Sequence, residues 1–531
     1  MVLRIPNNVL GLPHYQITIP NMSPMWIHFC ASLSMPSSLA EPMATAVLLM
    51  IFGILMLIAV LSSRAMDRLG IPTVLLLLVL GMLGGAQGLG GIWFHNFHFA
   101  YRLGTIALIL ILFEGGFNTS VAEVRRVLWA SSLLATFGVL VTAAITAALA
   151  WLLGLGLSES LLVGAVVSST DAAAVFSVLR AGKLNLKPRL GRLIEIESCF
   201  NDPTAVMLTT LMIAIMEKHK ESLWLLFLGI PMQLAIGAAA GIAVGIGSRF
   251  VLRRATLSTS GLVPVFTLAT ALISYAGTTV LGGSGFLAVY LTGVFMDASS
   301  LPYRGGLVRV HAALGWLGQI GVFLMLGFMV LPSELWHVAW IGLAIAILLA
   351  VVARPVAVAL CLLPLRYSIK ETAFVGWVGL RGAVPVILAT FPLMAHLPGA
   401  QKIFNIVFFV VVINTLFPGS TIRWATRWLG LASDEKPAPE AVLEINSSRP
   451  LTSDMRSFLI EPSVAVCGAK LSEVELPSSA AVMLIVREGN LVAPRGATVL
   501  NAGDHVYIFF DRQDRSLIDL LFGRNEEGGV G

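Results

Sequence analysis

Carboxylates and an asparagine stand at the head of an apolar stretch, residues 195–213, which reads EIESCFNDPTAVMLTTLMI. The stretch contains Glu195, Glu197 and Asp202 but no lysine or arginine that could pair with them. A charged side chain in the middle of a membrane span costs about 2.5–3.5 kcal/mol on insertion scales, so such a residue is functional unless a partner neutralises it. The chemistry of this stretch therefore depends on what neutralises its carboxylates.

Asp202 has the neighbours that a cation would need. Ser198 and Asp202 are four residues apart and share one face of a helix. Pro203 has no amide hydrogen, so the carbonyl of Cys199 loses its helical donor. Carboxylate, hydroxyl and carbonyl oxygens are the ligands that hard cations prefer, and a lone carboxylate in a low-dielectric site binds a proton when no cation is present. We therefore expect Asp202 to bind H⁺ and a metal cation in turn, which is the chemistry of an exchanger.

Two other apolar segments are interrupted by residues that break helices. Residues 166–176, VVSSTDAAAVF, carry Thr170 and Asp171, and residues 378–389, VGLRGAVPVILA, carry Arg381 between glycines and before a proline. Broken helices at matching places in two halves of a chain indicate the binding site of a secondary transporter. Asp171, beside Thr170, is therefore expected to contribute to the site.

The remaining charges inside apolar segments have more than one interpretation. We expect Glu197 and Arg381 to form a structural ion pair that holds the core together. Arg354, which precedes a proline in VVARPVAV, is expected to mark a helix kink or an interface rather than to bind a ligand. Glu114, in LFEGGF, lies near the inner end of its span, where a role in the site and anchoring at the lipid interface both fit.

The chain that carries these residues is 57% hydrophobic and 12% charged over 531 residues. Soluble domains carry about 25% charged residues, and recurring apolar runs of about 20 residues are typical of membrane-spanning helices. We predict a polytopic α-helical membrane protein with thirteen spans. The expected spans are 44–62, 71–88, 101–116, 127–154, 160–179, 193–215, 223–250, 262–280, 284–298, 312–332, 337–363, 371–396 and 402–422.

Basic residues between the spans predict the orientation in the membrane. Fifteen lysines and arginines follow odd-numbered spans and four follow even-numbered spans. Because short cytoplasmic loops carry the excess of basic residues, the N-terminus is expected outside and the C-terminus in the cytoplasm. The two interrupted spans are the fifth and the twelfth, each second from the end of a six-helix block. This placement predicts two inverted six-helix repeats with crossed discontinuous helices.

The composition changes after Pro437, where long apolar runs stop. RSFLI, SVAV, AVMLIVR and HVYIFF favour strands, REGN at 487–490 favours a hairpin turn, and 514–522 favours a closing amphipathic helix. We predict four parts: an irregular leader over 1–42, a transmembrane domain over 43–425, a linker over 426–451, and a small cytosolic α/β domain over 452–531.

Several classes of partner and site are excluded by these patterns. The net charge of +5 comes from basic residues spread between spans, which is a membrane-orientation pattern rather than a nucleic-acid-binding face. The four cysteines have no paired spacing, so neither a disulfide framework nor a zinc site is expected. No cofactor is expected either.

Four motifs together resemble the NhaP-type branch of bacterial cation:proton antiporters. They are LFEGGF, SSTDAAAVFSVLR, EIESCFNDPTAV and WVGLRGAVPVILA. The resemblance extends over about residues 44–525 and is closest to the potassium/proton antiporters that carry a cytoplasmic TrkA-C (RCK C-terminal) module. It implies a dimer with a thirteen-helix inverted-repeat fold, and a module that binds a small regulatory ligand, such as a nucleotide.

The resemblance also implies roles for residues. Asn201 and Asp202 match the ion-binding pair, and the asparagine implies electroneutral exchange of one H⁺ per cation. Ser198, Thr170 and Asp171 match positions that contribute to the cation site, and Asp202, Ser198 and Thr170 would hold the monovalent cation. Glu114 matches an acidic position near that site, while Glu197 and Arg381 match the family's core ion pair.

We therefore expect alternating-access exchange of K⁺, or alternatively Na⁺, for H⁺ across a bacterial inner membrane. Two other functions stay open on the sequence. A ligand-gated potassium channel would need a filter motif such as TVGYG, which the sequence does not contain. An intramembrane aspartyl protease could use Asp171 and Asp202, although the proline after Asp202 and the interrupted twelfth span do not fit that chemistry.

Overall fold

The computed structural model describes most of the chain. The described residues are 2–4, 16–18, 40–69, 72–88, 94, 96–182, 184–217, 223–254, 259, 261–296, 301, 304–433, 453–487 and 490–523. Most of the predicted leader (1–42) lies outside them, apart from an antiparallel pairing of β1 (Val2–Arg4) with β2 (Gln16–Thr18) and the start of the first helix. The predicted linker lies outside them beyond residue 433. The chain divides into a helical unit, which holds most residues up to 433, and a second unit that holds the C-terminal sheet.

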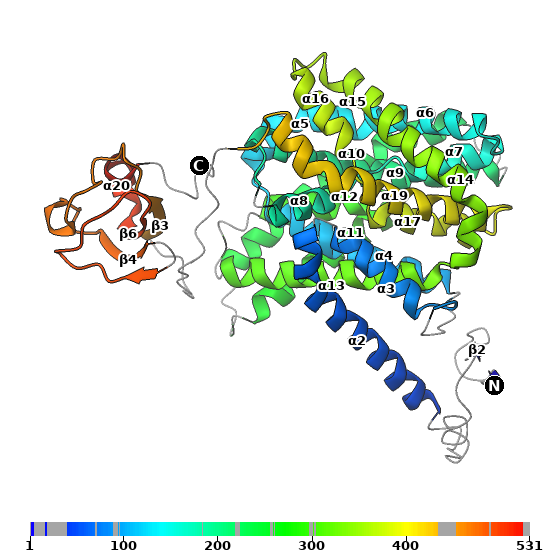
Figure 1. The fold of residues 1–531 in the computed structure, drawn as a ribbon, viewed down its shortest axis with the longest axis horizontal. Helices are drawn as coiled ribbons and strands as arrows, with labels where there is room; N and C mark the ends of the chain where they lie inside the picture. The colour runs from blue at the N-terminus through cyan, green and yellow to red at the C-terminus, as the bar shows by residue number, and fades with distance from the viewer. Residues whose placement is uncertain are drawn as a thin grey trace. The chain divides into compact units, whose positions relative to one another are not determined.

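Helices coincide with every expected span (Figure 1). They are α2 (Ala40–Leu69), α3 (Thr73–Gly84), α4 (Phe97–Phe117), α5 (Val121–Leu133), η2 (Leu134–Gly138), α6 (Val139–Leu152), α7 (Leu157–Val166), α8 (Ala172–Ala181), α9 (Pro188–Met216), α10 (Leu223–Arg254), α11 (Leu262–Val280), α12 (Gly285–Met296), α13 (Arg304–Met329), α14 (Pro332–Leu348), η4 (Leu349–Ala353), α15 (Arg354–Leu362), α16 (Ile369–Trp377), α17 (Ala383–Leu388), α18 (Thr390–Met394) and α19 (Ala400–Trp428). Among the described residues, eight helices, counting continuous runs as one, are long and apolar enough to cross a membrane. The number of thirteen crossings stays a prediction.

Irregular backbone occurs at corresponding places in the two halves. The fifth span is broken between α7 and α8, and the twelfth is broken between α16 and α17, where Gly and Pro were expected to interrupt it. The fourth and eleventh spans each contain one π-helical turn, η2 and η4. Both kinds of irregularity are therefore seven spans apart, which agrees with the predicted repeat, and π-helical turns are frequent at functional sites.

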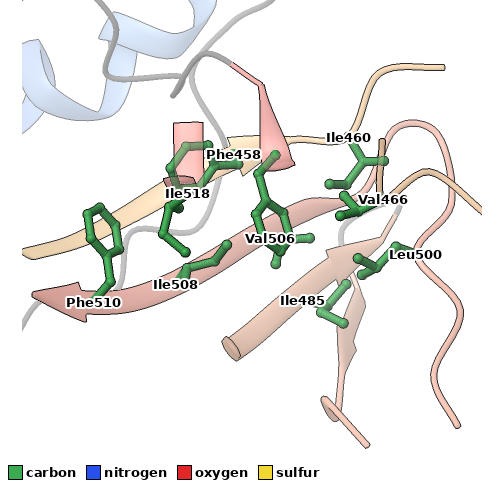
Figure 2. Close-up of a cluster of buried hydrophobic side chains, with 10 residues drawn as sticks. Phe458, Ile460, Val466, Ile485, Leu500, Val506, Ile508, Phe510 and Ile518 are labelled. Carbon is green, nitrogen blue, oxygen red and sulfur yellow. The ribbon is translucent and has the colours of Figure 1, made fainter. Parts of the chain in front are cut away.

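The C-terminal unit contains a four-stranded antiparallel sheet in the order β3-β6-β4-β5. Its elements are β3 (Ser453–Leu459), η5 (Leu471–Glu473), β4 (Ala481–Arg487), β5 (Asn490–Val492), β6 (His505–Asp511), η6 (Arg512–Asp514) and α20 (Arg515–Phe522). Figure 2 shows the buried side chains that join the sheet to α20, among them Phe458, Ile508 and Ile518. The pairing of Arg487 with Asn490 agrees with the predicted hairpin, whose residues 488 and 489 lie outside the described part.

One strand prediction in this unit is wrong. SVAV, residues 463–466, forms turns rather than a strand. Val464 and Val466 still pack into the core, so the run is apolar because it is buried and not because it is extended. Short apolar runs do not distinguish these two situations.

An ion pair between a buried carboxylate and a partly exposed arginine joins β4 to the loop before β6. Arg487 donates from Nε and Nη2 to the two carboxylate oxygens of Asp504, both at 2.8 Å. Burial opposes ionisation of Asp504, but the hydrogen bonds from Arg487 and from the Asn501 amide outweigh it and hold the pKa of Asp504 below its usual range. The pair holds the loop before β6 against the sheet.

Candidate cation site

The two breaks are hydrogen-bonded to each other, so the broken helices cross. The amide of Asp171 in the first break donates to the carbonyl of Leu380 in the second, at 2.8 Å. In return, Nε of Arg381 donates to the carbonyl of Val167, at 2.9 Å, and its Nη1 donates to the carbonyl of Gly379. Backbone groups that the breaks release from helical pairing thus find partners in the opposite break, which an apolar membrane environment requires.

Asp171 lies where two short helices begin. Its Oδ1 accepts a hydrogen bond from the amide of Ala174 at 3.2 Å, which caps the first turn of α8. Gly382, which precedes α17, lies so close that a Cβ there would collide with the Asp171 carboxylate. The partial positive charge at a helix N-terminus attracts a carboxylate, so the first turn of α8 holds the Asp171 side chain at the crossing of the two breaks.

Glu197 is neutralised by Arg354. Arg354 donates from Nη1 to Oε1 of Glu197 at 3.2 Å and from Nη2 to Oε2 at 3.0 Å, and each residue is 1% exposed. The hydroxyl of Thr170 and the side-chain amide of Asn201 also donate to this carboxylate. Glu197 is therefore a buried structural anion with a full set of donors.

The predicted pair of Glu197 with Arg381 is wrong in its partner. Arg381 is equally buried, but in the described part of the chain it donates hydrogen bonds to the carbonyl oxygens of Val167 and Gly379 rather than to a carboxylate. Arg354 is also buried, so it is not an interface cation, whereas the helix irregularity expected beside it is present as the π-helical turn η4. Arg354 follows directly after the π-helical turn η4, which re-aims the side chains beyond it.

Helix geometry divides the predicted ligands of α9 into two groups. Ser198 lines the cavity and its hydroxyl donates to the carbonyl of Thr170, at 2.8 Å, in the break. Asn201 faces the other way: its amide donates to the hydroxyl of Thr170 at 2.6 Å and it does not line the cavity. Thr170 lines the cavity too, but its hydroxyl donates to Glu197. Asn201 and Thr170 thus hold the break against α9.

A cavity of about 300 Å³ lies against the crossing point. Its walls come from α3, α4, α8, α9, α13 and the start of α17. The carboxylates that line it are Glu114, Asp171, Glu195 and Asp202, and no lysine or arginine is among its lining residues. Asp202 is 7% exposed, and its Oδ1 is buried without a hydrogen-bond partner in the described part of the chain.

The other two carboxylates have partners of their own. Glu195 accepts from Arg192 at 2.9 Å and from the Thr119 hydroxyl at 3.3 Å. Glu114 accepts from the side-chain amide of Asn118 at 3.0 Å. Asp202 therefore differs from Glu114 and Glu195, because one of its oxygens has no hydrogen-bond partner among the described residues. Burying such an oxygen is energetically costly unless an ion or a proton binds to it.

One wall of the cavity was not anticipated. Trp316, Gln319 and Phe323 of α13 line it together with the predicted residues. Gln319 is the one side-chain amide in an otherwise apolar run, and this polarity is the sequence feature that could have indicated that α13 lines the cavity.

Comparison with known proteins matches two family models to this chain. The model described as "Sodium/hydrogen exchanger, transmembrane" matches residues 46–428, and the TrkA-C domain model matches residues 455–523. The first covers all the residues of the cavity and of both breaks, and the second covers the C-terminal sheet and α20.

Similar whole proteins extend over most of the chain. The K⁺/H⁺ antiporter NhaP of Alkalimonas amylolytica is 38% identical over 88% of this chain and 81% of its own length. The K⁺/H⁺ antiporter NhaP2 of Shewanella sp. (strain ANA-3) is 39% identical over 90% and 83%. The structure of the sodium proton antiporter MjNhaP1 from Methanocaldococcus jannaschii at pH 8 matches with a TM-score of 0.61 and 25% identity, over 72% of this chain and 100% of that one. The predicted helical membrane fold is thereby confirmed.

Proposed function

Because this chain belongs to the sodium/hydrogen exchanger family, whose members are cation/proton antiporters, we propose that it exchanges one monovalent cation for one H⁺ with Asp202 as the shared site. The predicted resemblance and the transporter function are confirmed by the family match. An aspartyl protease has no support, because the family consists of transporters.

The observation that carries the proposal is the unpartnered oxygen of Asp202. It lies in a cavity with room for a cation and water, and no basic side chain among the lining residues competes for it. The other deeply buried carboxylate of α9, Glu197, is already neutralised by Arg354. Asp202 is thus the carboxylate whose charge can change during a cycle.

The charge of Asp202 explains why transport is coupled. With either guest bound, the site is neutral, whereas the empty carboxylate would have to move through a low-dielectric environment as an unpaired ion, which is strongly unfavourable. Only loaded forms exchange sides, so a cation leaves one side only when a proton crosses in the other direction. Each pH unit supplies about 1.4 kcal/mol per proton, enough to sustain about a tenfold cation gradient.

K⁺ is the proposed cation, with Na⁺ as the alternative. The support for K⁺ comes from the names of the relatives that cover most of the chain. Oxygen ligands alone bind both ions, and the solved structure that matches is that of a sodium proton antiporter. The choice between K⁺ and Na⁺ therefore has to be made by measuring the cation selectivity of transport.

The test uses purified protein in sealed vesicles with a pH gradient. Addition of K⁺, Rb⁺, Na⁺ or Li⁺ is expected to collapse the gradient, with K⁺ most effective at equal concentration, and a voltage-sensitive dye is expected to show no potential. Collapse without any added cation, or a potential of the size expected for one net charge per turnover, would contradict one-for-one exchange.

Gly382 provides a second test, because space rather than backbone conformation restricts that position. We expect Gly382→Ala to slow cation-driven proton movement at least tenfold, since the added methyl group displaces Asp171 from the crossing, and overpacking of this kind costs about 1–3 kcal/mol. Gly277→Ala is the matched control, because a Cβ there meets no atom within 4 Å. Equal transport rates for the two variants would show that the crossing tolerates the displacement.

The further assignments rest on the family and on charge. We propose a homodimer in a bacterial inner membrane, with membrane lipid around it, the N-terminus outside and the C-terminus in the cytoplasm, as the distribution of basic residues favours. The TrkA-C domain is proposed to bind a small regulatory molecule, with a nucleotide as one candidate. Neither a cofactor nor nucleic acid enters this proposal.

A further inference from the structure

His311 is a buried polar residue that the exchange mechanism does not use. It lies on α13, is 1% exposed, and its Nε2 is 2.7 Å from the hydroxyl of Thr267 on α11. Its ring centroid is 4.9 Å from that of Phe113 and 5.4 Å from that of Phe117, both on α4. One imidazole ring therefore joins three helices, through a hydrogen bond on one side and aromatic contacts on the other.

The two phenylalanines flank Glu114 in the sequence, and Glu114 lines the cavity. The next turns of α13 continue the same contact with α4. A Cβ at Gly315 would lie 3.6 Å from Oε2 of Glu114, and one at Gly318 would lie 3.1 Å from Cα of Ala107. His311, Gly315 and Gly318 thus form one line of contact along α4.

A further side of α4 is held by direct backbone packing against α12. A Cβ at Gly293 of α12 would lie 2.8 Å from the carbonyl oxygen of Phe113, and a Cβ at Gly116 would collide with the carbonyl of Tyr290. On that side α4 cannot move without displacing the backbone of α12. On the side of α13, a side chain, His311, opposes rotation of α4 about its own axis.

We propose that His311 is a positioning residue that sets where the Glu114 carboxylate stands relative to a cation bound at Asp202. The proposal rests on the exchange function proposed above. Rotation of α4 would move Phe113, Glu114 and Phe117 together. Because His311 contacts the rings of Phe113 and Phe117, it also fixes the position of the Glu114 side chain. The hydrogen bond to Thr267 fixes the plane of the imidazole, so α11 also helps to hold His311 against α4.

The test measures the apparent KM for K⁺, the maximal rate, and the pH profile of exchange in vesicles. His311→Leu is expected to raise the KM for K⁺ about tenfold, the lower end of what loss of an outer-shell support costs in metal affinity, with a smaller change in maximal rate. His311→Gln is expected to restore most of the affinity, because its amide can still bond to Thr267. Thr267→Val is expected to give an intermediate KM. It tests the same contact if His311→Leu does not fold.

A double-mutant cycle with Glu114→Gln separates positioning from a structural role. If His311 acts through Glu114, the variant Glu114→Gln alone raises KM, and adding His311→Leu raises it no further. Ser274→Ala is the matched control, because its hydroxyl makes a buried 2.7 Å hydrogen bond to Thr292 between α11 and α12 and not to His311. That variant is expected to lower thermal stability without a change in KM.

Three results would overturn the proposal. They are an unchanged KM in His311→Leu and Thr267→Val, an unchanged KM in Glu114→Gln, and the same rise caused by His311→Leu with and without Glu114→Gln. Failure of the exchange function itself looks different, because then unmodified protein would show no cation-dependent collapse of the pH gradient.

Discussion

Replacing Asp202 with asparagine is expected to abolish cation-driven proton movement, with a loss of at least a hundredfold in rate. The amide keeps the size and much of the hydrogen bonding of the carboxylate but carries no charge and binds no proton near neutral pH. The uncharged amide therefore cannot bind H⁺ and the metal cation alternately. The measurement is the rate at which K⁺ or Na⁺ collapses a pH gradient in vesicles that hold equal amounts of folded protein.

Glu195→Gln is the matched control for this variant. Glu195 also lines the cavity, but Arg192 already pairs with it at 2.9 Å. We expect Glu195→Gln to change the rate by no more than about fivefold, since the loss of a partly exposed pair costs at most about 1 kcal/mol. Asp202→Glu, which keeps the charge, should retain measurable exchange with altered selectivity. An Asp202→Asn variant that still exchanges at the rate of unmodified protein would show that Asp202 is not the shared binding site.

Competition for one carboxylate also predicts a pH dependence. When protons and K⁺ exclude each other at Asp202, the apparent KM for K⁺ rises about tenfold for each pH unit on the acidic side of the carboxyl's own titration, because each pH unit is a tenfold change in proton activity. Saturating K⁺ should then restore the rate at low pH until proton release becomes limiting. Isotopic K⁺ binding to purified protein measures the same competition without transport, and a binding constant that does not change between acidic and alkaline pH would exclude a shared site.

The positions of the breaks could be predicted because local chemistry decides them. Gly379, Gly382 and Pro385 weaken the helix wherever it packs, and the run Ser-Ser-Thr-Asp at 168–171 offers side chains that compete with helical backbone bonding. Asp202 could be predicted for a similar reason, since a carboxylate without a basic neighbour in a span is informative by itself.

The partner of Glu197 could not be predicted, because it depends on packing between distant helices. Arg354 and Arg381 both lie inside apolar segments, and the chain separates Glu197 from Arg354 by 157 residues. The π-helical turn before Arg354 changes which way that side chain points, and nothing in the residues of η4 announces it. Sequence spacing did place Ser198 and Asp202 on one face of α9, but only the folded chain shows that this face meets the cavity.

The pair of Glu197 with Arg354 is expected to dominate the stability of the helical unit. Removing one member of a buried ion pair leaves an uncompensated charge, which costs about 3–5 kcal/mol, so Arg354→Met and Glu197→Leu should each lower the unfolding temperature strongly. The double variant Glu197→Leu with Arg354→Met should be more stable than either single variant. Arg354→Lys should fail to rescue, because Arg354 donates to both carboxylate oxygens of Glu197 and an ammonium does not reproduce that fork.

A double-mutant cycle distinguishes this pair from the one expected on the sequence. Thermal unfolding in detergent should give a coupling of at least about 2 kcal/mol between Glu197 and Arg354. Arg381 is the matched control, since it is as deeply buried but donates to the carbonyls of Val167 and Gly379. Arg381→Met should weaken the crossing of the breaks and slow exchange, while its coupling to Glu197→Leu should be weaker than that of Arg354→Met. A stronger coupling of Glu197 to Arg381 than to Arg354 would contradict this assignment and show that Arg381 is the residue that neutralises the carboxylate of Glu197.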